Sequence, residues 1–232
     1  MSKQWGRRRS DNRAYAKGSV PVSGPITVTV PPTKETSSAR QLLSMELSFH
    51  KKSQGKPKDF TMYPQEFFLQ YGKIYNSKEQ LTDEELSKLK LDAQMINPKL
   101  KECYYNSAML ATSNPEYTYV EGYITSRGLP TLPHGWVVDK KGRVIDVTLQ
   151  VKSRGGDFEK LRRGKKVKSF DVSNNVIGVV PEGWEYYGVP IKTDYLMKSM
   201  LKRGLSPPLI DYTHGFDALK LTKSRIRKEV LA

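Results

Sequence analysis

The stretch that decides the fold covers residues 134–151 and reads HGWVVDKKGRVIDVTLQV. Two runs rich in β-branched residues flank residues 139–142, which end in Gly142. Glycine suits a turn position that needs positive φ, and β-branched residues favour strands. This stretch therefore predicts an antiparallel β-hairpin that begins near His134 and returns through Asp146.

The spacing of His134 and Asp146 gives this hairpin a chemical meaning. The two residues stand twelve positions apart, so they face each other to within about one residue of register if the chain turns around residues 139–142. Because twelve is even, a turn with an odd number of residues places both side chains on one face, about 5 Å apart at Cβ. A two- or four-residue loop misaligns them by one residue unless a bulge corrects the register. On one face, the carboxylate would fix the tautomer and the orientation of the imidazole.

The single cysteine of the chain, Cys103, lies in a segment that predicts a helix, residues 99–113, just after Pro98. A lone cysteine in a helix is most often a small buried apolar residue. A position early in the helix favours another interpretation, because unpaired N–H groups and the helix dipole there stabilise a thiolate, the nucleophilic form. Few other arrangements compete, since His50 lies among lysines and His214 lies in an irregular segment.

These residues resemble the transglutaminase-like and papain-like superfamily of cysteine hydrolases. Its members often read His-Ala-Trp, then a hydrophobic strand, a turn with glycine and a strand that ends Asp-x-Thr. Here residues 134–136 read His-Gly-Trp and residues 146–148 read Asp-Val-Thr, while residues 103–108 look like the family's cysteine-bearing helix start. The resemblance covers roughly residues 98–192. It implies a nucleophile at Cys103, a general base at His134 and an orienting acid at Asp146.

The surroundings of this site depart from the family pattern in two ways. Gly135 stands where alanine is usual, a difference that we expect to be harmless. No residue is an assured oxyanion donor; the backbone N–H of Cys103 is the natural candidate, and Gln94 is a second one. Trp136 and Glu121 are candidates for the cleft, although an aromatic residue there more often fills the core and an acidic one more often forms a surface ion pair. We expect neither a cofactor nor a metal site.

The remaining patterns predict an α+β fold, with the nucleophile's helix packed on a small antiparallel sheet in a transglutaminase-like core. Helical patterns include an aromatic stripe over residues 63–75 and a capping box at Thr82 and Glu85. The expected helices are 41–52, 63–75, 82–95, 99–113 and 193–200; the expected strands, besides the hairpin, are 117–122, 176–180 and 184–191. The expected organisation is a disordered basic tail (1–40), a helical N-terminal portion (41–97), the catalytic core (98–195) and a basic C-terminal extension (196–232).

A formal charge of +15 favours polyanionic partners such as nucleic acid or an acidic protein. Residues 1–40 fit a disordered basic tail, with a nucleic-acid-binding arm as the sharper alternative. One cysteine excludes an intramolecular disulfide and favours a reducing compartment, the cytoplasm. No apolar run approaches the roughly 20 residues of a membrane span, so no membrane partner is expected. The basic clusters are Arg7, Arg8 and Arg9 in the tail and Arg162, Arg163, Lys165 and Lys166 in a later insertion.

Taken together, the residues predict a thiol enzyme that acts on an amide of a protein or peptide through a thioester. Peptidase, deamidase and glutamine–amine acyl-transfer activities share this first step and stay open. The alternatives are a basic protein that binds nucleic acid, and an inactive thiol-hydrolase fold used for protein contacts. Size and basic tails also resemble those of virus- or phage-encoded proteins, which implies a host cytoplasm or a virion.

Overall fold

The computed structural model describes residues 37–53, 55–56, 58–126, 129–150, 174–204, 207–210 and 217–232. The chain divides into two units, residues 1–34 and 35–232, and all the described residues belong to the second. The two predicted basic clusters lie outside the described residues: Arg7, Arg8 and Arg9, and Arg162, Arg163, Lys165 and Lys166.

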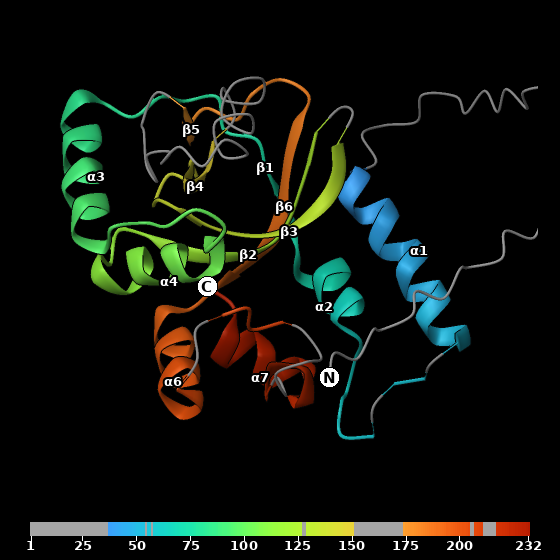
Figure 1. Ribbon diagram of the computed structural model, residues 1–232. Coiled ribbons are helices and arrows are strands. Elements are labelled where there is room, and N and C mark those ends of the chain that lie inside the picture. Colours follow the sequence, from blue (N-terminus) through green and yellow to red (C-terminus); the bar gives the residue numbers. More distant parts are fainter. Residues whose placement is uncertain are drawn as a thin grey trace, which may run out of the picture. The chain divides into compact units, whose positions relative to one another are not determined.

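A six-stranded antiparallel sheet forms the centre of this unit, with the strand order β1-β6-β2-β3-β4-β5 (Figure 1). The sheet curls until its two edges meet: beyond β5 the N–H of Val180 donates to the C=O of Ser77, which follows β1, at 2.9 Å. The strands are β1 (Lys73–Tyr75), β2 (Thr118–Ser126), β3 (Leu129–Val138), β4 (Val144–Gln150), β5 (Asn175–Gly178) and β6 (Trp184–Ile191).

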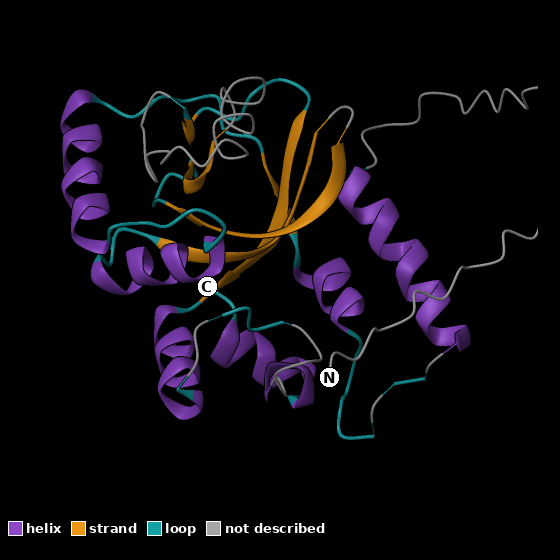
Figure 2. Ribbon diagram, viewed as in Figure 1, coloured by secondary structure: helices purple, strands orange, loops and turns teal. Residues whose placement is uncertain are grey.

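Helices pack on one face of the curled sheet, so the fold is α+β, as the sequence predicts (Figure 2). The apolar residues of that face, such as Tyr119, Val137 and Val189, join the large core that the helices share. The opposite face forms the inside of the curl, because residues of both edge strands, Tyr75 and Val176, belong to its smaller cluster. The helices are α1 (Ser38–Ser53), α2 (Pro64–Tyr71), α3 (Asp83–Ile96), α4 (Cys103–Ser113), α6 (Thr193–Arg203) and α7 (Lys223–Arg225), with a 3₁₀ turn η1 (Asp217–Lys220) and a π-helical turn η2 (Ile226–Val230).

The start of α3 follows the predicted capping box. The side chain of Thr82 accepts the N–H of Glu85 at 3.2 Å, and the Glu85 carboxylate accepts the N–H of Thr82 at 2.8 Å. Two orphan donors of the first turn are thereby satisfied reciprocally. The helix ends at Asn97, which adopts the left-handed conformation with φ 46°.

Two expected helices are shorter than the sequence indicated. The aromatic stripe over residues 63–75 is helical only as far as Tyr71, and Tyr75 lies on strand β1. The chain turns at Gly72, where a Cβ would come within 2.7 Å of the Tyr187 ring, so the helix stops against β6. The helix expected from residue 99 begins at Cys103, because Lys101, with φ 67°, interrupts the segment before it.

The end of the chain contributes to the core. Ile226 and Val230 are fully buried within the large apolar cluster. The last residues also pair with β6, since Leu231 bridges Ile191 and the N–H of Ala232 donates to the C=O of Pro190 at 3.1 Å. Across the described ranges, no helix combines the length and the apolar character that a membrane crossing requires.

Candidate active site

The β3–β4 hairpin turns through five residues, 139–143, between the paired residues Val138 and Val144. Asp139 organises the turn: its Oδ1 accepts the N–H groups of Lys141 and Arg143, both at 2.9 Å. Gly142 adopts φ 77°, the left-handed region that glycine enters without steric cost. The turn therefore has an odd number of residues, which puts His134 and Asp146 on the same face of the sheet.

His134 and Asp146 meet through their side chains, with Nε2 of His134 lying 2.6 Å from Oδ2 of Asp146. The described β3–β4 ladder is limited to the two pairs next to the turn, and the histidine–aspartate bond joins the strands beyond it. Both groups are enclosed: His134 is 6% exposed and Asp146 is completely buried. Because Nε2 is occupied by the carboxylate, Nδ1 is the ring atom that faces the rest of the site.

Four donors surround the Asp146 carboxylate. Its Oδ1 accepts the backbone N–H groups of Thr148 and Leu149, both at 3.0 Å, where β4 departs from regular pairing. Its Oδ2 accepts the hydroxyl of Tyr186 at 3.0 Å in addition to contacting His134. A buried carboxylate is tolerated when its lone pairs are satisfied in this way. The carboxylate is thus held as a fixed, oriented acceptor for the imidazole.

Cys103 is the first residue of α4 and reaches the same histidine. Its thiol lies near enough to the His134 side chain to help raise the pKa of that histidine, and Cys103 is half-buried. The preceding residue, Glu102, provides no side-chain cap within the described contacts, so its carboxylate does not satisfy the N–H groups of the first helical turn. The structure therefore brings Cys103, His134 and Asp146 together, from one helix and two strands.

Close approach of α4 to β3 depends on Gly135. A Cβ at this position would lie 2.9 Å from Cδ1 and 3.1 Å from the backbone Cα of Tyr104. An alanine, the usual residue of the family that the sequence resembles, would thus press on the backbone beside Cys103. On the other side of the same contact, the Ser107 hydroxyl donates to the C=O of Gly135 at 2.9 Å.

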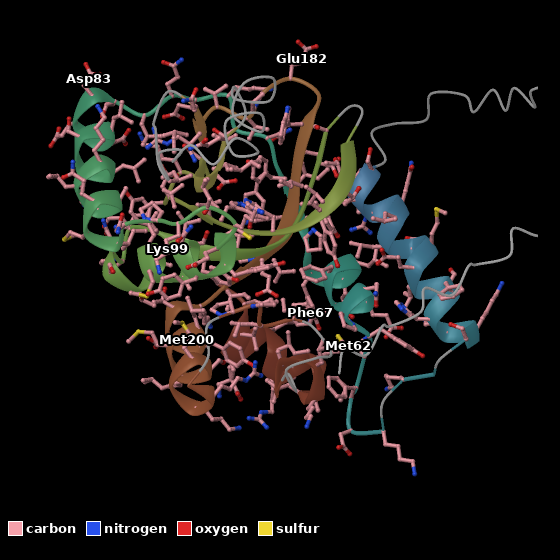
Figure 3. All side chains as sticks on the ribbon, in the orientation of Figure 1. Met62, Phe67, Asp83, Lys99, Glu182 and Met200 are labelled. Atoms are coloured by element: carbon pink, nitrogen blue, oxygen red, sulfur yellow. The ribbon has the colours of Figure 1, made fainter. Side chains whose placement is uncertain are left out.

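Asn106 ties helix α4, which carries Cys103, to strand β4, which carries Asp146. Its Oδ1 accepts the N–H of Lys99 at 3.0 Å and its Nδ2 donates to the C=O of Lys99 at 2.7 Å. These bonds fix the segment that leads into α4, where Lys99 lies (Figure 3). The same Nδ2 donates to Oγ1 of Thr148 at 2.9 Å. Since the N–H of Thr148 in turn contacts Asp146, one side chain links the positions of Cys103 and the acid.

The protonation of His134 follows from these neighbours. Burial by itself lowers the pKa of His134, but the negative charge and hydrogen bond of Asp146, together with the Cys103 thiol, raise it from 6.5 to about 10. The ring is therefore cationic at neutral pH, as expected for an imidazolium held between a carboxylate and a sulfur atom.

Trp136 is a core residue rather than part of a cleft. It is fully buried, stacks on His134 with the ring planes 16° apart, and meets Tyr75 and Tyr186 edge to face. Among the described residues, its Nε1 has no hydrogen-bond partner. Trp136 therefore supports the imidazole from inside the curl and is shielded from a substrate.

Glu121 is a buried acceptor rather than a cleft residue, and Gln94, the second oxyanion candidate, is exposed on α3. Glu121 is buried, and its carboxylate accepts the N–H groups of Leu209 and Ile210, both at 2.7 Å, and the hydroxyl of Tyr119 at 3.0 Å. It serves as an acceptor that anchors the chain at residues 207–210. Gln94 lies on the exposed side of α3, which turns Ala93 inward. The backbone N–H of Cys103, at the start of α4, is thus the remaining candidate.

Sequence reasoning missed Tyr186 and Asn106 as partners of the site, and it identified Thr148 as a motif residue without the bonds that this residue makes. Tyr186 and Asp146 are separated by 40 positions, so no local pattern connects them. Asn106 follows the cysteine by one helical turn, the one local signal that could have identified it.

No match to the chain appears among models of known protein families, among curated proteins or among solved structures. Within the described ranges, no group of three or more His, Cys, Asp and Glu side chains is arranged to hold a metal ion.

Proposed function

We propose that this protein is a cysteine-dependent acyl-transfer enzyme that acts on an amide of a protein or peptide. The observation that carries the proposal is the buried His134, whose Nε2 lies 2.6 Å from Asp146 and whose pKa is raised in part by the nearby Cys103 thiol. A histidine oriented by a carboxylate on one nitrogen and facing a thiol with the other is the arrangement that nucleophilic catalysis requires. A cysteine at a helix start, packed on neighbouring antiparallel strands that carry the other two residues, also supports a transglutaminase-like core.

In the proposed reaction, His134 starts as the imidazolium, with the proton of Cys103 already on Nδ1, and the Cys103 thiolate attacks the carbonyl carbon of the amide. The backbone N–H of Cys103, at the start of α4, donates to the developing oxyanion. The C–N bond then breaks, and the His134 imidazolium gives its proton to the departing amine. A thioester with Cys103 remains.

The second half of the reaction regenerates the enzyme. Water or an amine attacks the thioester carbonyl while His134 accepts its proton, and Cys103 leaves as the thiolate. Water gives hydrolysis and an amine gives transfer, so both outcomes share the same residues. Asp146 keeps the ring oriented throughout, because its Oδ1 is anchored by the two backbone N–H groups at residues 148 and 149.

The test uses the fact that Cys103 is the single cysteine of the chain, so every thiol alkylation reports on it. Peptides with a glutamine side chain and peptides with a fluorogenic C-terminal amide would be offered to the wild type, with and without hydroxylamine as acceptor. We expect release of ammonia or amine and an acyl-enzyme visible by intact-mass spectrometry. Prior alkylation with iodoacetamide should abolish both.

Cys103→Ala is the decisive variant, with Thr112→Ala on the same helix as the matched control, because its hydroxyl bonds only within α4 in the described contacts. Cys103→Ala should fold, should not react with iodoacetamide and should lose all turnover, whereas Thr112→Ala should resemble the wild type. Equal turnover by the wild type and Cys103→Ala would refute the proposal. A wild type that alkylates but never acylates would instead favour an inactive thiol-hydrolase fold.

A further inference from the structure

Tyr186 of β6 shares one oxygen of Asp146 with the histidine. Its hydroxyl donates to Oδ2 at 3.0 Å, the same atom that lies 2.6 Å from Nε2 of His134. Tyr186 is fully buried, and its ring meets those of His134 and Trp136 edge to face at centroid distances of 6.4 and 5.2 Å. Two groups therefore compete for the charge on one carboxylate oxygen.

The hydroxyl of Tyr186 is a permanent donor in this position. Burial, and then the negative charge of Asp146, raise the pKa of Tyr186 well above its usual value of 10. The phenol consequently keeps its proton over the whole range in which His134 titrates, and it cannot act as a second base.

The groups that face His134 come from several elements. Asp146 on β4 and Cys103 on α4 act on it directly. On β2 the opposite residue is Gly122, which has no side chain. On β1 the hydroxyl-bearing Tyr75 contacts Trp136. Tyr186 on β6 reaches the charge of His134 indirectly, because its hydroxyl bonds the same oxygen of Asp146 that contacts the histidine.

We propose, building on the proposed function, that Tyr186 is a positioning residue whose hydroxyl limits how tightly Asp146 holds the proton and the ring of His134. Loss of the proton from His134 leaves the Asp146 carboxylate alone inside the curl, where a remaining donor stabilises it. The Tyr186 hydroxyl is that donor. Without this hydroxyl, His134 retains its proton more strongly, so the imidazolium is a poorer acid toward the departing amine.

The test is an NMR titration of the His134 ring in wild type, Tyr186→Phe and Tyr187→Phe. The chain has three histidines, so the His134 signals are assigned by their loss in His134→Gln. Tyr187 is a matched control: it is the next residue, equally buried, and its hydroxyl donates to the C=O of Phe68 at 2.6 Å on the opposite face. Near-UV circular dichroism checks that each variant keeps its fold.

We expect the titration midpoint of His134 to rise by about half a pH unit or more in Tyr186→Phe, roughly a threefold gain in proton affinity. Tyr187→Phe should leave it unchanged. In an Asp146→Asn background, Tyr186→Phe should have no further effect, because the route through the carboxylate is gone. Three results would each overturn the inference: coincident midpoints in the wild type and Tyr186→Phe, a downward shift, or a shift of the same size in the Asp146→Asn background as in the wild-type background.

A second readout connects the residue to turnover. For a peptide amide that the wild type converts, Tyr186→Phe should lower kcat near neutral pH at least several-fold while KM stays the same, since the phenol contacts Asp146 rather than the substrate. A normal kcat despite a shifted midpoint would contradict the link to catalysis. A shifted midpoint in a protein that converts no amide would uphold the positioning of His134 and count against the proposed function instead.

Discussion

At the level of single residues, the properties of His134 depend on Asp146 and Cys103, and Asp146 is in turn bonded by Tyr186. These three residues come from three different elements of the fold. Burial in the curl acts against a charged ring, yet Asp146 and Cys103 together reverse that effect and leave the ring cationic. The cost of enclosing Asp146 is offset by its backbone donors and by Tyr186. The charge at this site is therefore a property of the cluster rather than of one side chain.

The stability of the protein should fall as the pH rises through the titration of His134. The pKa of His134 is about 10 in the folded protein, against an ordinary value of 6.5, so between these values the folded state binds one more proton than the unfolded state. The contribution of His134 to the free energy of unfolding is fully present below about pH 6.5 and is lost by about pH 10. Between these values, the free energy of unfolding falls with a slope that approaches about 1.4 kcal/mol per pH unit.

Urea unfolding at several pH values measures this slope. In His134→Gln, the part of the pH dependence of stability that comes from His134 should disappear, and in Asp146→Asn it should be much reduced. Parallel pH profiles for the wild type and His134→Gln would show that the ion pair does not form.

At the level of the secondary-structure elements, the site is a contact between a helix start and a hairpin. Gly135 lets α4 approach β3, Ser107 bonds across the contact, and Asn106 connects the segment before α4 to β4. Cys103 and Asp146 are thus held relative to each other by main-chain and amide groups. Small displacements of α4 should affect reactivity more than stability.

Gly135→Ala tests the close approach. The new Cβ would meet the Tyr104 backbone at 3.1 Å, so we expect a loss of roughly 1–3 kcal/mol of stability and a slower alkylation of Cys103 by iodoacetamide. Thermal unfolding and the alkylation rate at pH 7 measure the two effects. An unchanged alkylation rate would mean that α4 accommodates the added methyl group without displacing Cys103.

Asn106→Ala tests the link between α4 and β4. Removing a buried amide that makes three hydrogen bonds should cost about 1–3 kcal/mol, because the groups of Lys99 and Thr148 lose their partner. Thr112→Ala, which removes a half-buried hydroxyl from the same helix, should cost less than about 0.5 kcal/mol. Chemical denaturation compares the two variants, and equal losses would show that Asn106 is not a special anchor.

At the level of the whole molecule, the C-terminal residues belong to the core that supports the sheet. The sequence predicts a basic C-terminal extension over residues 196–232. The structure buries Ile226 and Val230 completely, and the N–H of Lys192 donates to the C=O of Val230 at 2.8 Å. The end of the chain is therefore fastened to the end of β6, the strand that carries Tyr186.

Ile226→Ala should destabilise the protein by about 2–5 kcal/mol, the usual cost of truncating a fully buried aliphatic side chain. Lys228→Ala, two residues away and exposed, should change stability by less than about 0.5 kcal/mol. Equilibrium denaturation with urea measures both. A loss of under about 1 kcal/mol in Ile226→Ala would indicate that the C-terminal segment does not pack on the core.

The hairpin, the shared face of His134 and Asp146 given an odd turn, the helix of Cys103 and the capping box at Thr82 were all predictable from the sequence. These features depend on local periodicity and turn chemistry, which short-range sterics and hydrogen bonds control. The start of α4 and the end of α2 were not predictable, because a left-handed Lys101 and the contact of Gly72 with Tyr187 decide them. The length of the turn was left open by the sequence, and the bonds of Asp139 and the positive φ of Gly142 decide it. The approach of Cys103 to His134 and the partner Tyr186 emerged only in the folded chain, because they depend on how segments distant in sequence pack together, which no local pattern encodes.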